Sequence, residues 1–383
     1  MTTPGPLSTT ALLVPTPSAP FRLAPVTLAP PLADEVLIRI TASGLCHTDL
    51  SCAAGVLPTG PNAVLGHEGA GVVVAAGSAA THVAPGDAVL LSFSHCQACA
   101  QCAAGHPAYC HDFNARNFGG RRPEGGCAVT TGDGEACHSS FFGQSSFARH
   151  AVAHRSCVVK VPEGTDLALF APLGCGMQTG AGAVLNTLGV KEGDQGAVAV
   201  FGVGSCGMAA IMAAALIRRA RIVIAVDLDA ERLALARELG ATHTVLGGAA
   251  DVVAQIREIC GGSEEWRGVD YAVDCTGVPA VVRTMIDSLG MRGRAATVGA
   301  PGPGKDVRVD VMGMLTFGKE YVGCSEGDSN PSEFIPYLMR MHAEGRFPLE
   351  RFVEYFDVKD FENAIEGAKS GKVIKPVLLW DKI

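Results

Sequence analysis

The chain has 383 residues, of which 48% are hydrophobic and 18% charged, so it is expected to fold into globular domains and is not a disordered chain. Lys and Arg total 30 against 38 for Asp and Glu, and the resulting net charge of −8 disfavours binding to nucleic acid or to an anionic membrane. The 14 cysteines and the Pro-rich start without a cationic signal segment favour a reducing compartment, the cytoplasm, with some thiols on metal.

Short strands and long loops are predicted between residues 34 and 175. Alternating or β-branched runs between turn residues predict strands at 36–40, 69–75, 88–91 and 157–161. From about residue 181 the pattern changes to alternating strands and helices, which predicts a parallel, doubly wound sheet.

The elements of this second region follow one another at βαβ spacing. Strands are expected at 197–201, 221–226, 244–246, 269–275, 295–298 and 320–323. Helices are expected at 205–218, 230–239, 251–260, 279–289, 331–344 and 360–370. The apolar end, 373–380, either closes this sheet or returns to the first region.

Residues 196–217 carry no charge and are long enough to span a membrane. Glycines interrupt the middle of this segment, with strand formers before them and helix formers after them. The segment therefore predicts a buried strand, a tight turn and a buried helix.

Cysteines with metal-ligand spacing occur at Cys96, Cys99, Cys102 and Cys110, as two CxxC steps followed by a fourth Cys. Four thiolates on one loop close a tetrahedron around Zn²⁺ and leave no open position, which is typical of a structural site. An iron–sulfur cluster, or a set of unrelated thiols, is the alternative.

A second candidate metal site is formed by Cys46, His67 and Cys175, with Glu68 beside the histidine. Two thiolates and one imidazole leave the fourth zinc position open for water or substrate. These residues are far apart in sequence, so their spacing alone is a weak argument. The glycines around His67 and Cys175 strengthen it, because they permit close backbone approach.

The segment Phe201–Gly207 reads FGVGSCG, a GxGxxG run between a predicted strand and a predicted helix. Asp227 ends the next predicted strand. This combination is the dinucleotide fingerprint, in which glycines admit a pyrophosphate to the helix N-terminus and the acid binds the adenosine ribose. A carboxylate at that point repels a 2′-phosphate, which favours NAD over NADP.

Together these motifs resemble the zinc-containing medium-chain alcohol dehydrogenases. The resemblance is carried, besides the four-Cys loop and the GxGxxG run, by Gly44–Asp49 (GLCHTD), Gly66–Gly71 (GHEGAG), Leu173–Gly180 (LGCGMQTG) and Asp274–Gly277 (DCTG). The segment Asn117–Pro123 (NFGGRRP) is most similar to the aryl, or benzyl, alcohol dehydrogenase branch.

The resemblance implies an α/β protein with two domains. A GroES-like, β-rich catalytic domain is expected at 1–176 and 319–383, and a Rossmann domain with a doubly wound parallel sheet at 177–318. It also implies two zinc ions per chain, NAD as cofactor and a homodimer or homotetramer.

The resemblance further implies roles for individual residues. Cys46, His67 and Cys175 hold the catalytic zinc, and Thr48 begins the proton relay. Glu68 either tunes the zinc from behind these ligands or briefly ligates it. His47 lies near the cofactor pyrophosphate. Many members carry a His at the position of Ser51, so the end of the relay is left open between Ser51 with water and His47.

Two larger sets of residues complete the predicted site. The cofactor-binding residues are expected to be His47, Thr179, Gly202, Val203, Gly204, Ser205, Cys206, Gly207, Asp227, Leu228, Arg232, Cys275, Thr276, Val298, Gly299 and Lys375. The substrate pocket is expected to include Thr48, Leu57, Phe93, Phe118, Phe141 and Phe142.

The implied function is the reversible oxidation of an aromatic or allylic primary alcohol to the aldehyde, with hydride transfer to NAD. Zinc lowers the pKa of the alcohol hydroxyl in this chemistry. A formaldehyde dehydrogenase that acts on a thiol adduct is one alternative. A catalytically silent zinc-stabilised scaffold and a zinc ribbon for nucleic acid are the others, and the acidic charge disfavours the last.

Overall fold

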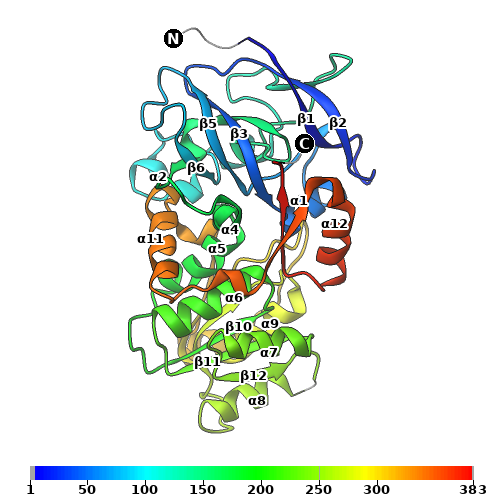
Figure 1. Ribbon diagram of the computed structural model, residues 1–383. Coiled ribbons are helices and arrows are strands. Elements are labelled where there is room, and N and C mark those ends of the chain that lie inside the picture. Colours follow the sequence, from blue (N-terminus) through cyan, green and yellow to red (C-terminus); the bar gives the residue numbers. More distant parts are fainter. Residues whose placement is uncertain (1–4, 250, 382–383) are drawn as a thin grey trace. The chain divides into compact units, whose positions relative to one another are not determined.

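The computed structural model describes residues 5–249 and 251–381, and Figure 1 shows its elements. The chain divides into two compact units. Unit 1 contains the chain up to Cys175, then Asn330–Tyr337, and the chain from Glu350 onward. Unit 2 contains Gly176–Ser329 and Leu338–Leu349. Each unit is described by itself below.

Unit 1 contains a mixed sheet in the order β16-β17-β3-β5-β6-β9, with β8 also paired to β3. Its strands are β3 (Glu35–Gly44), β5 (Gly69–Ala76), β6 (Ala88–Leu91), β8 (His150–His154), β9 (Val158–Lys160), β16 (Val353–Asp357) and β17 (Lys375–Leu379). A second sheet, in the order β4-β1-β2-β7, consists of β1 (Leu7–Val14), β2 (Arg22–Leu28), β4 (Ala63–Val64) and β7 (Val129–Thr131).

The C-terminal strand β17 lies in the unit 1 sheet, where it pairs antiparallel with β3 and parallel with β16. Figure 1 shows this red strand beside the blue β3. The apolar end of the chain therefore returns to the first region, a choice that the sequence left open. Its burial in the core of this unit, down to a fully buried Trp380, is the physical reason.

Helices of unit 1 are short and lie between the strands that carry the candidate site. They are α1 (His47–Ala53), α2 (Ala100–Ala103), α3 (Phe113–Phe118), α4 (Leu167–Phe170) and α12 (Phe361–Ser370). Two short 3₁₀ helices, η2 (Phe141–Gly143) and η4 (Ala171–Gly174), precede functional segments. Helix α11 (Pro331–Ala343) begins in unit 1 and ends in unit 2.

Unit 2 is built on six strands in the order β12-β11-β10-β13-β14-β15, and every pairing is parallel. The strands are β10 (Ala197–Phe201), β11 (Ile222–Asp227), β12 (His243–Leu246), β13 (Val269–Asp274), β14 (Leu289–Thr297) and β15 (Glu320–Gly323). Numbered along the chain, this order is 3-2-1-4-5-6, the doubly wound arrangement. The structure thus has the β-rich first region and the doubly wound second region that the sequence predicts.

Helices of unit 2 lie between its strands in the chain, except α5, which precedes the first strand. They are α5 (Gly176–Gly182), α6 (Ser205–Met212), α7 (Ala230–Glu238), α8 (Val252–Ile259), α9 (Pro279–Asp287) and α10 (Val311–Phe317). Strand β10 is buried along its whole length, because it is central in the sheet. The predicted strands and helices of this region agree with the structure to within a few residues, if the π-helical turn Ala213–Ile217 that continues α6 is counted with it. The exception is β14, which begins at Leu289 instead of the predicted 295.

Residues 319–329 were expected to belong with the C-terminal part of the catalytic domain. In the structure they group with unit 2, because β15 pairs with β14 along four residues. The chain returns to unit 1 at Asn330.

The uncharged segment 196–217 contains β10 and α6, as the sequence predicts. No single helix in the described ranges is long and apolar enough to cross a membrane. One bent pair, Leu167–Gly174 with Gly176–Thr187, meets the requirement by length and composition alone.

Candidate zinc and cofactor sites

The predicted catalytic ligands converge in unit 1. One ligand atom from each of Cys46, His67, Glu68 and Cys175 lies within 4.8 Å of all the others. Cys46 caps helix α1 directly after β3, and His67 precedes β5. Cys175 follows η4. Fold topology thus brings together two thiols and an imidazole that are distant in sequence.

Asp49 fixes the orientation of the His67 ring, a role that the sequence reasoning did not assign. Its Oδ1 lies 3.0 Å from His67 Nδ1 and accepts a hydrogen bond from the Gly66 N–H, while Oδ2 accepts one from the Cys46 N–H. Asp49 and His67 are both fully buried. Its position three residues after Cys46, in a capping box, was the available signal.

The free nitrogen of His67 points to the metal as the missing partner. His67 Nε2 is buried and has no hydrogen-bond partner among the described residues. A carboxylate on one ring nitrogen and a vacant second nitrogen are the usual arrangement of a zinc-ligating histidine. The two thiols and this nitrogen therefore fit a Cys₂His zinc site.

Electrostatics favour the thiolate at Cys46. A hydrogen bond with Cys175 lowers the pKa of Cys46 well below its usual value. Burial opposes this shift, and the charges of His67 and Lys375 add to it. A thiolate is the form that binds zinc.

Lys375 was expected to bind a cofactor phosphate, and in the structure it pairs with Glu68. Its Nζ lies 2.8 and 2.7 Å from the two carboxylate oxygens of Glu68 and 3.3 Å from the Leu45 carbonyl oxygen. Its side chain is 1% exposed. Lys375 is therefore paired with the buried carboxylate next to the ligands, and its contact with a cofactor phosphate stays a prediction.

This pairing affects the titration of both partners. Burial opposes the charged lysine, but the Glu68 carboxylate raises the pKa of Lys375 above its usual value. Burial raises the pKa of Glu68, and Lys375 opposes that shift. The ammonium thus stays charged and holds the carboxylate in place.

The four cysteines of the predicted structural site are also assembled. The sulfur atoms of Cys96, Cys99, Cys102 and Cys110 lie within 4.8 Å of one another. Cys96 and Cys102 are 3.8 Å apart, and a tetrahedron with Zn–S bonds of about 2.3 Å requires about 3.8 Å between sulfurs.

Main-chain donors surround this second set of thiols. The N–H groups of Ala98 and Cys99 donate to Cys96 Sγ, at 3.4 and 3.2 Å. Hydrogen bonds from the backbone of Cys102 and His111 lower the pKa of Cys99 to about 6. The loop therefore fits a closed Cys₄ zinc site.

Aromatic rings cover the imidazole of His67. Phe142 stacks on it with ring centroids 4.5 Å apart, and Phe141 meets it edge-on at 5.3 Å. Phe118 packs on both phenylalanines, at 5.8 and 5.2 Å. Three predicted pocket residues therefore lie together in one apolar cluster beside the ligands.

The other predicted pocket and relay residues surround the same core. Phe93 is fully buried and reaches the cluster through Phe113, and Leu57 packs against the core. Thr48 Oγ1 lies 3.7 Å from Cys46 Sγ. His47 is exposed, and Ser51 is half-buried.

The GxGxxG turn of unit 2 has the geometry that its motif predicts. It joins β10 to α6, and Gly204 caps the helix. Asp227 ends β11, where its Oδ2 accepts a hydrogen bond from the Val203 N–H at 2.7 Å and Oδ1 one from the Asp229 N–H at 3.0 Å. A carboxylate is thus fixed beside the glycine turn.

A cavity of about 270 Å³ lies beside the end of β11, the strand that ends at Asp227. Its walls are mostly apolar. The lining residues are Phe201, Val226, Gly247, Gly248, Ala249, Val252, Val253, Ala280, Val281 and Thr284. The cavity is next to Asp227 in sequence and in the sheet, so it suits the flat, apolar face of a purine whose ribose reaches the acid.

Several of the remaining predicted cofactor residues lie around Asp274, at the end of β13. Thr276 Oγ1 donates to Asp274, and the N–H groups of Val298 and Gly299 donate to the Asp274 carbonyl oxygen. The Cys275 N–H donates to the Phe201 carbonyl oxygen, which ties this segment to the glycine turn. Leu228 is 76% exposed. Arg232 lies in the first turn of α7, and Thr179 lies within α5.

These features define a zinc-binding, nicotinamide-linked dehydrogenase. Residues 32–163 match the alcohol dehydrogenase GroES-like domain, and residues 202–343 match the zinc-binding dehydrogenase domain. The chain is 40% identical to geraniol dehydrogenase of Castellaniella defragrans over 94% of its own length and 95% of that protein. The chain therefore belongs to the zinc-binding alcohol dehydrogenase family.

Two solved structures extend the comparison. A crystal structure of an alcohol dehydrogenase zinc-binding domain protein from Burkholderia ambifaria matches with a TM-score of 0.93 and 46% identity, covering 98% of this chain and 99% of that one. The benzyl alcohol dehydrogenase of Acinetobacter calcoaceticus matches with a TM-score of 0.91 and 38% identity, covering 97% and 99%.

Proposed function

We propose that this enzyme oxidises aromatic or allylic primary alcohols to aldehydes, reversibly, with NAD as hydride acceptor. The observation that carries the proposal is the aromatic cluster beside the His67 ring, in which Phe142 stacks on the ring, Phe141 meets it edge-on and Phe118 packs on both phenylalanines. An apolar, aromatic wall beside the reacting oxygen favours a flat or unsaturated alcohol over ethanol. Geraniol and benzyl alcohol, the alcohols for which two of the relatives are named, support the same class.

Zinc held by Cys46, His67 and Cys175 would act as a Lewis acid on the alcohol oxygen and lower the pKa of its hydroxyl. The Thr48 hydroxyl lies within hydrogen-bonding range of the Cys46 sulfur, and so beside the proposed zinc position. A hydroxyl there can accept the alcohol proton and donate its own proton onward. The proton then leaves through exposed His47 or through half-buried Ser51 and water. Glu68, held by Lys375, keeps a negative charge behind the ligands.

NAD rather than NADP is proposed as the cofactor because of Asp227. Its carboxylate is the natural acceptor for the two adenosine ribose hydroxyls, and it would repel a 2′-phosphate. The apolar cavity of about 270 Å³ next to it is proposed as the adenine site.

A substrate panel with NAD and NADP at matched concentrations tests this function directly. We expect NADH formation with benzyl alcohol and geraniol, at a kcat/KM at least about 10-fold above ethanol and with little turnover of NADP. A zinc-replete enzyme that prefers ethanol, or is inert to the whole panel, would contradict the proposal. Formaldehyde with and without glutathione is the parallel arm, because strict thiol dependence would instead support the formaldehyde dehydrogenase alternative.

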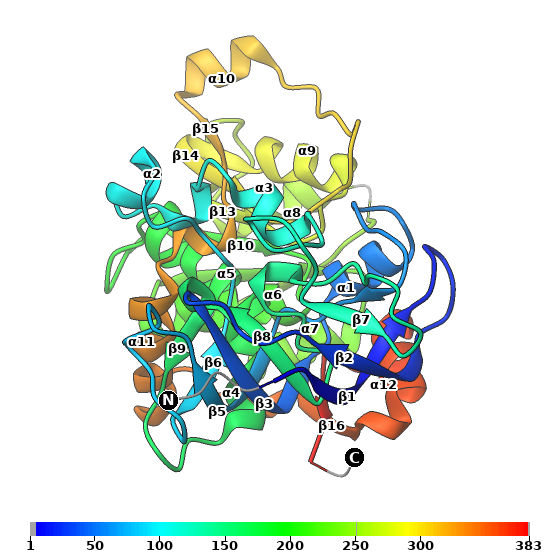
Figure 2. The same ribbon diagram turned by 90° about the horizontal axis from the view of Figure 1, so that it is seen from above.

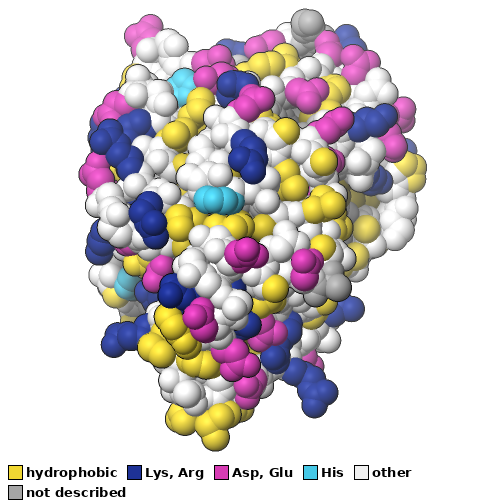
Figure 3. Space-filling model, turned by 90° about the horizontal axis from the view of Figure 1, so that it is seen from below, with side chains coloured by type: hydrophobic (Ala, Val, Ile, Leu, Met, Phe, Trp, Pro, Cys, Tyr) yellow, Lys and Arg dark blue, Asp and Glu magenta, His cyan; other side chains and the backbone are white. Residues whose placement is uncertain are grey.

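A homodimer is proposed from an exposed apolar edge of unit 2. Strand β15 ends the six-stranded sheet, and α10 beside it exposes Val311, Met312 and Leu315 at 74%, 68% and 76%. Figure 2 shows α10 projecting at this edge, and Figure 3 shows hydrophobic side chains gathered at the lower edge of the view from below. Edge-to-edge pairing with a second copy would satisfy the strand and cover these side chains.

A cytoplasmic location is proposed from the redox state of the cysteines. All 14 are free thiols, and six of them form the two zinc-ligand sets. Such a chain needs a reducing compartment.

A further inference from the structure

The segment Ser139–Phe147 packs against the residues around His67 in an unusual backbone conformation. Ser140, Phe142 and Ser145 have positive φ angles of 57°, 52° and 51° without being glycine. Such conformations are costly and persist only where the surrounding structure holds them. The segment, named here the strap, is therefore held in place by specific contacts.

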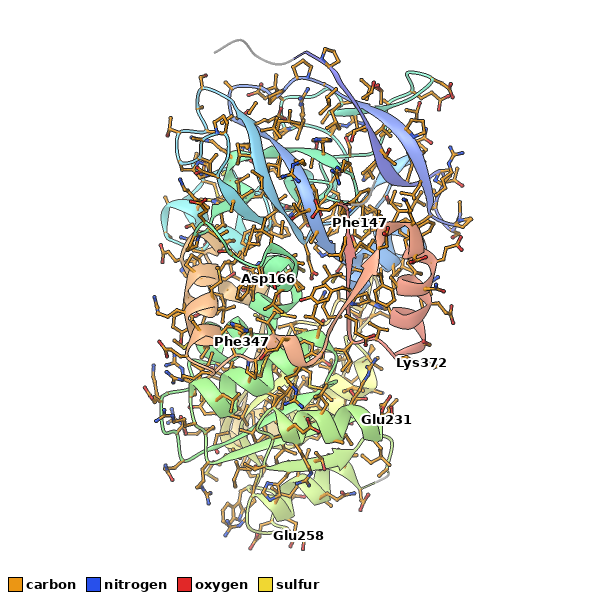
Figure 4. All side chains as sticks on the ribbon, in the orientation of Figure 1. Phe147, Asp166, Glu231, Glu258, Phe347 and Lys372 are labelled. Atoms are coloured by element: carbon orange, nitrogen blue, oxygen red, sulfur yellow. The ribbon has the colours of Figure 1, made fainter. Side chains whose placement is uncertain are left out.

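Hydrogen bonds tie the strap to the residues just before His67. Ser145 Oγ donates to the Val64 carbonyl oxygen at 2.6 Å and accepts from the Phe141 N–H at 3.0 Å. The Phe147 N–H, at the strap's end labelled in Figure 4, donates to the Leu65 carbonyl oxygen at 2.9 Å. These bonds hold the strap against Val64 and Leu65, which precede His67 in the chain.

Gln144 is the strap residue whose side chain binds the main chain on both sides of Glu68 and at Ser92. Its Nε2 donates to the carbonyl oxygens of His67 and Ser92, at 2.9 and 2.7 Å. Its Oε1 accepts from the Gly69 N–H at 3.1 Å. The side chain is 1% exposed, so these three bonds are made without water at the amide.

The Gln144 amide also connects to the third ligand. Ser92, whose carbonyl oxygen it binds, donates through Oγ to the Gly174 carbonyl oxygen at 2.7 Å, directly before Cys175. One amide thus joins the backbone at His67 to the backbone next to Cys175. A shift of either backbone would move a ligand atom, because each ligand side chain is short.

The side-chain amide of Asn117 binds the main chain in a similar way at Ser94, two residues after Ser92. Asn117 Oδ1 accepts from the Ser94 N–H at 2.8 Å, and its Nδ2 donates to the carbonyl oxygens of Ser94 and Phe113, at 3.0 and 2.8 Å. Ser94 is two residues before Cys96, the first ligand of the four-Cys loop. Asn117 is fully buried.

We propose that Gln144 is a positioning residue for the catalytic zinc ligands, and that Asn117 has the corresponding role for the four-Cys loop. The inference rests on the proposed two zinc ions per chain. Each amide binds both a donor and acceptors of the main chain, and Ser92 and Ser94, to which the two amides bind, lie beyond the end of β6. The catalytic set, with an open fourth position, depends on this support more than a closed loop of four thiolates does.

The test is the rate at which each zinc is lost to a coloured chelator, with the two sites told apart by alkylation and mass spectrometry. Gln144→Met keeps the length of the side chain and removes all three hydrogen bonds. We expect zinc loss and labelling at Cys46 and Cys175 to become about 10–100-fold faster, with Cys96, Cys99, Cys102 and Cys110 unchanged. Asn117→Leu is the matched variant and is expected to show the opposite selectivity.

Gln144→Glu is the second variant, for the case that the methionine protein does not fold. Its carboxylate still accepts from Gly69 but faces the carbonyl oxygens of His67 and Ser92 without a proton to donate, so selective loss is again expected. The visible spectrum of the cobalt-substituted enzyme reports the catalytic geometry independently of activity. Equal acceleration at both sites, or none at Cys46 and Cys175, would overturn the inference.

Zinc content of the wild type separates this inference from the proposed function. Two zinc ions per chain with no selective effect of Gln144→Met would refute only the role of Gln144. A wild type that holds no zinc at Cys46 and Cys175 would refute both.

Discussion

Glu68 and Lys375 form an ion pair with almost no solvent contact, side by side with the catalytic ligands. Removing two charges from water is expensive, and the pair is tolerated because both lysine–carboxylate contacts are short and the Leu45 carbonyl oxygen accepts a further bond. The residues are separated by 307 positions in the chain. The pair thus connects the C-terminal strand to the proposed zinc site.

Lys375→Met is expected to lower the free energy of unfolding by about 3–5 kcal/mol, because it leaves the Glu68 carboxylate buried without a partner. The double variant Glu68→Gln, Lys375→Met is expected to recover part of that loss, since no charge then remains unpaired. Urea unfolding measures both. Lys372→Met, an exposed lysine labelled in Figure 4, is the control and should change little. Equal losses at Lys372 and Lys375 would contradict the ion-pair argument.

His138 gives a pH dependence to the stability of unit 1. Burial, and then the charge of Arg121, lower the pKa of His138 below the ordinary 6.5. The unfolded chain takes up this proton near 6.5, whereas the folded chain takes it up only at lower pH, so stability is full above 6.5 and is lost as the pH falls below it. The buried Nε2 has no partner among the described residues that would accept the added proton.

The corresponding experiment compares wild type with His138→Gln by urea unfolding at several pH values between about 7 and 5. The wild type is expected to lose more stability on acidification, by a slope difference of less than one proton per molecule. Zinc loss at low pH affects both proteins, so the difference between them isolates His138. Parallel pH profiles would show that His138 is not the group responsible.

At the scale of elements, the turn between β10 and α6 needs glycine for two separate reasons. Gly202 has φ +82°, and a Cβ there would lie 2.5 Å from Thr276 Cγ2. Gly189 also has a positive φ, +66°, but nothing lies within 4 Å of its Cβ position. An alanine at either glycine would have a strained φ angle, but only an alanine at Gly202 would also clash with a neighbouring side chain. Comparing the two substitutions therefore separates the two effects.

Gly202→Ala is expected to weaken NADH binding by about 10-fold or more, because the turn must shift away from Thr276, and to lower stability by about 1–2 kcal/mol. Gly189→Ala should show a similar loss of stability without the loss of NADH affinity. Quenching of protein fluorescence by NADH measures the first quantity and urea unfolding the second. Equal NADH affinity in both variants would argue against the proposed pyrophosphate site.

Helix α10 and strand β15 lead to a prediction about assembly. Leu315→Glu places a charge in the exposed apolar group on α10, so it is expected to shift the sedimentation coefficient from dimer to monomer at micromolar concentration. Leu246→Glu, on β12 at the opposite edge of the same sheet and 54% exposed, is the control. Dissociation by both variants, or by neither, would contradict an interface at α10.

At the scale of the whole molecule, the two cysteine sets are expected to have separable effects. Cys46→Ser should reduce the zinc content from two ions per chain to one and lower kcat/KM by roughly 10³-fold, with a small change in Tm. Cys99→Ser should also remove one zinc but lower Tm by roughly 5 °C or more, because a closed site contributes folding energy. Elemental analysis with thermal unfolding checks both. Matching profiles for the two variants would refute the division into catalytic and structural sites.

Much of the fold and of the candidate site was predictable because its signals are local. The four-Cys loop closes within fourteen positions, from Cys96 to Cys110, and the glycine turn is defined by its flanking strand and helix. The strands of the N-terminal sheet, β1 and β2, were missed, because Pro-rich and polar positions obscure their alternation. Their pairing with each other and with β4 and β7 supplies the regularity that the sequence pattern lacks.

The sequence by itself determined the two metal-ligand sets, the dinucleotide turn with its acid, and the alternation that yields a doubly wound sheet. Only the tertiary structure decided what holds those ligands: Asp49 on His67, Gln144 on the backbone at His67 and Ser92, and Lys375 on Glu68. The physical reason is that the four-Cys loop and the glycine turn are defined by residue type and local spacing, whereas Cys46, His67 and Cys175 could be grouped only through the motifs of the resemblance. The supporting bonds join main-chain groups and side chains up to 307 positions apart, and these meet only once the strands of unit 1 have paired.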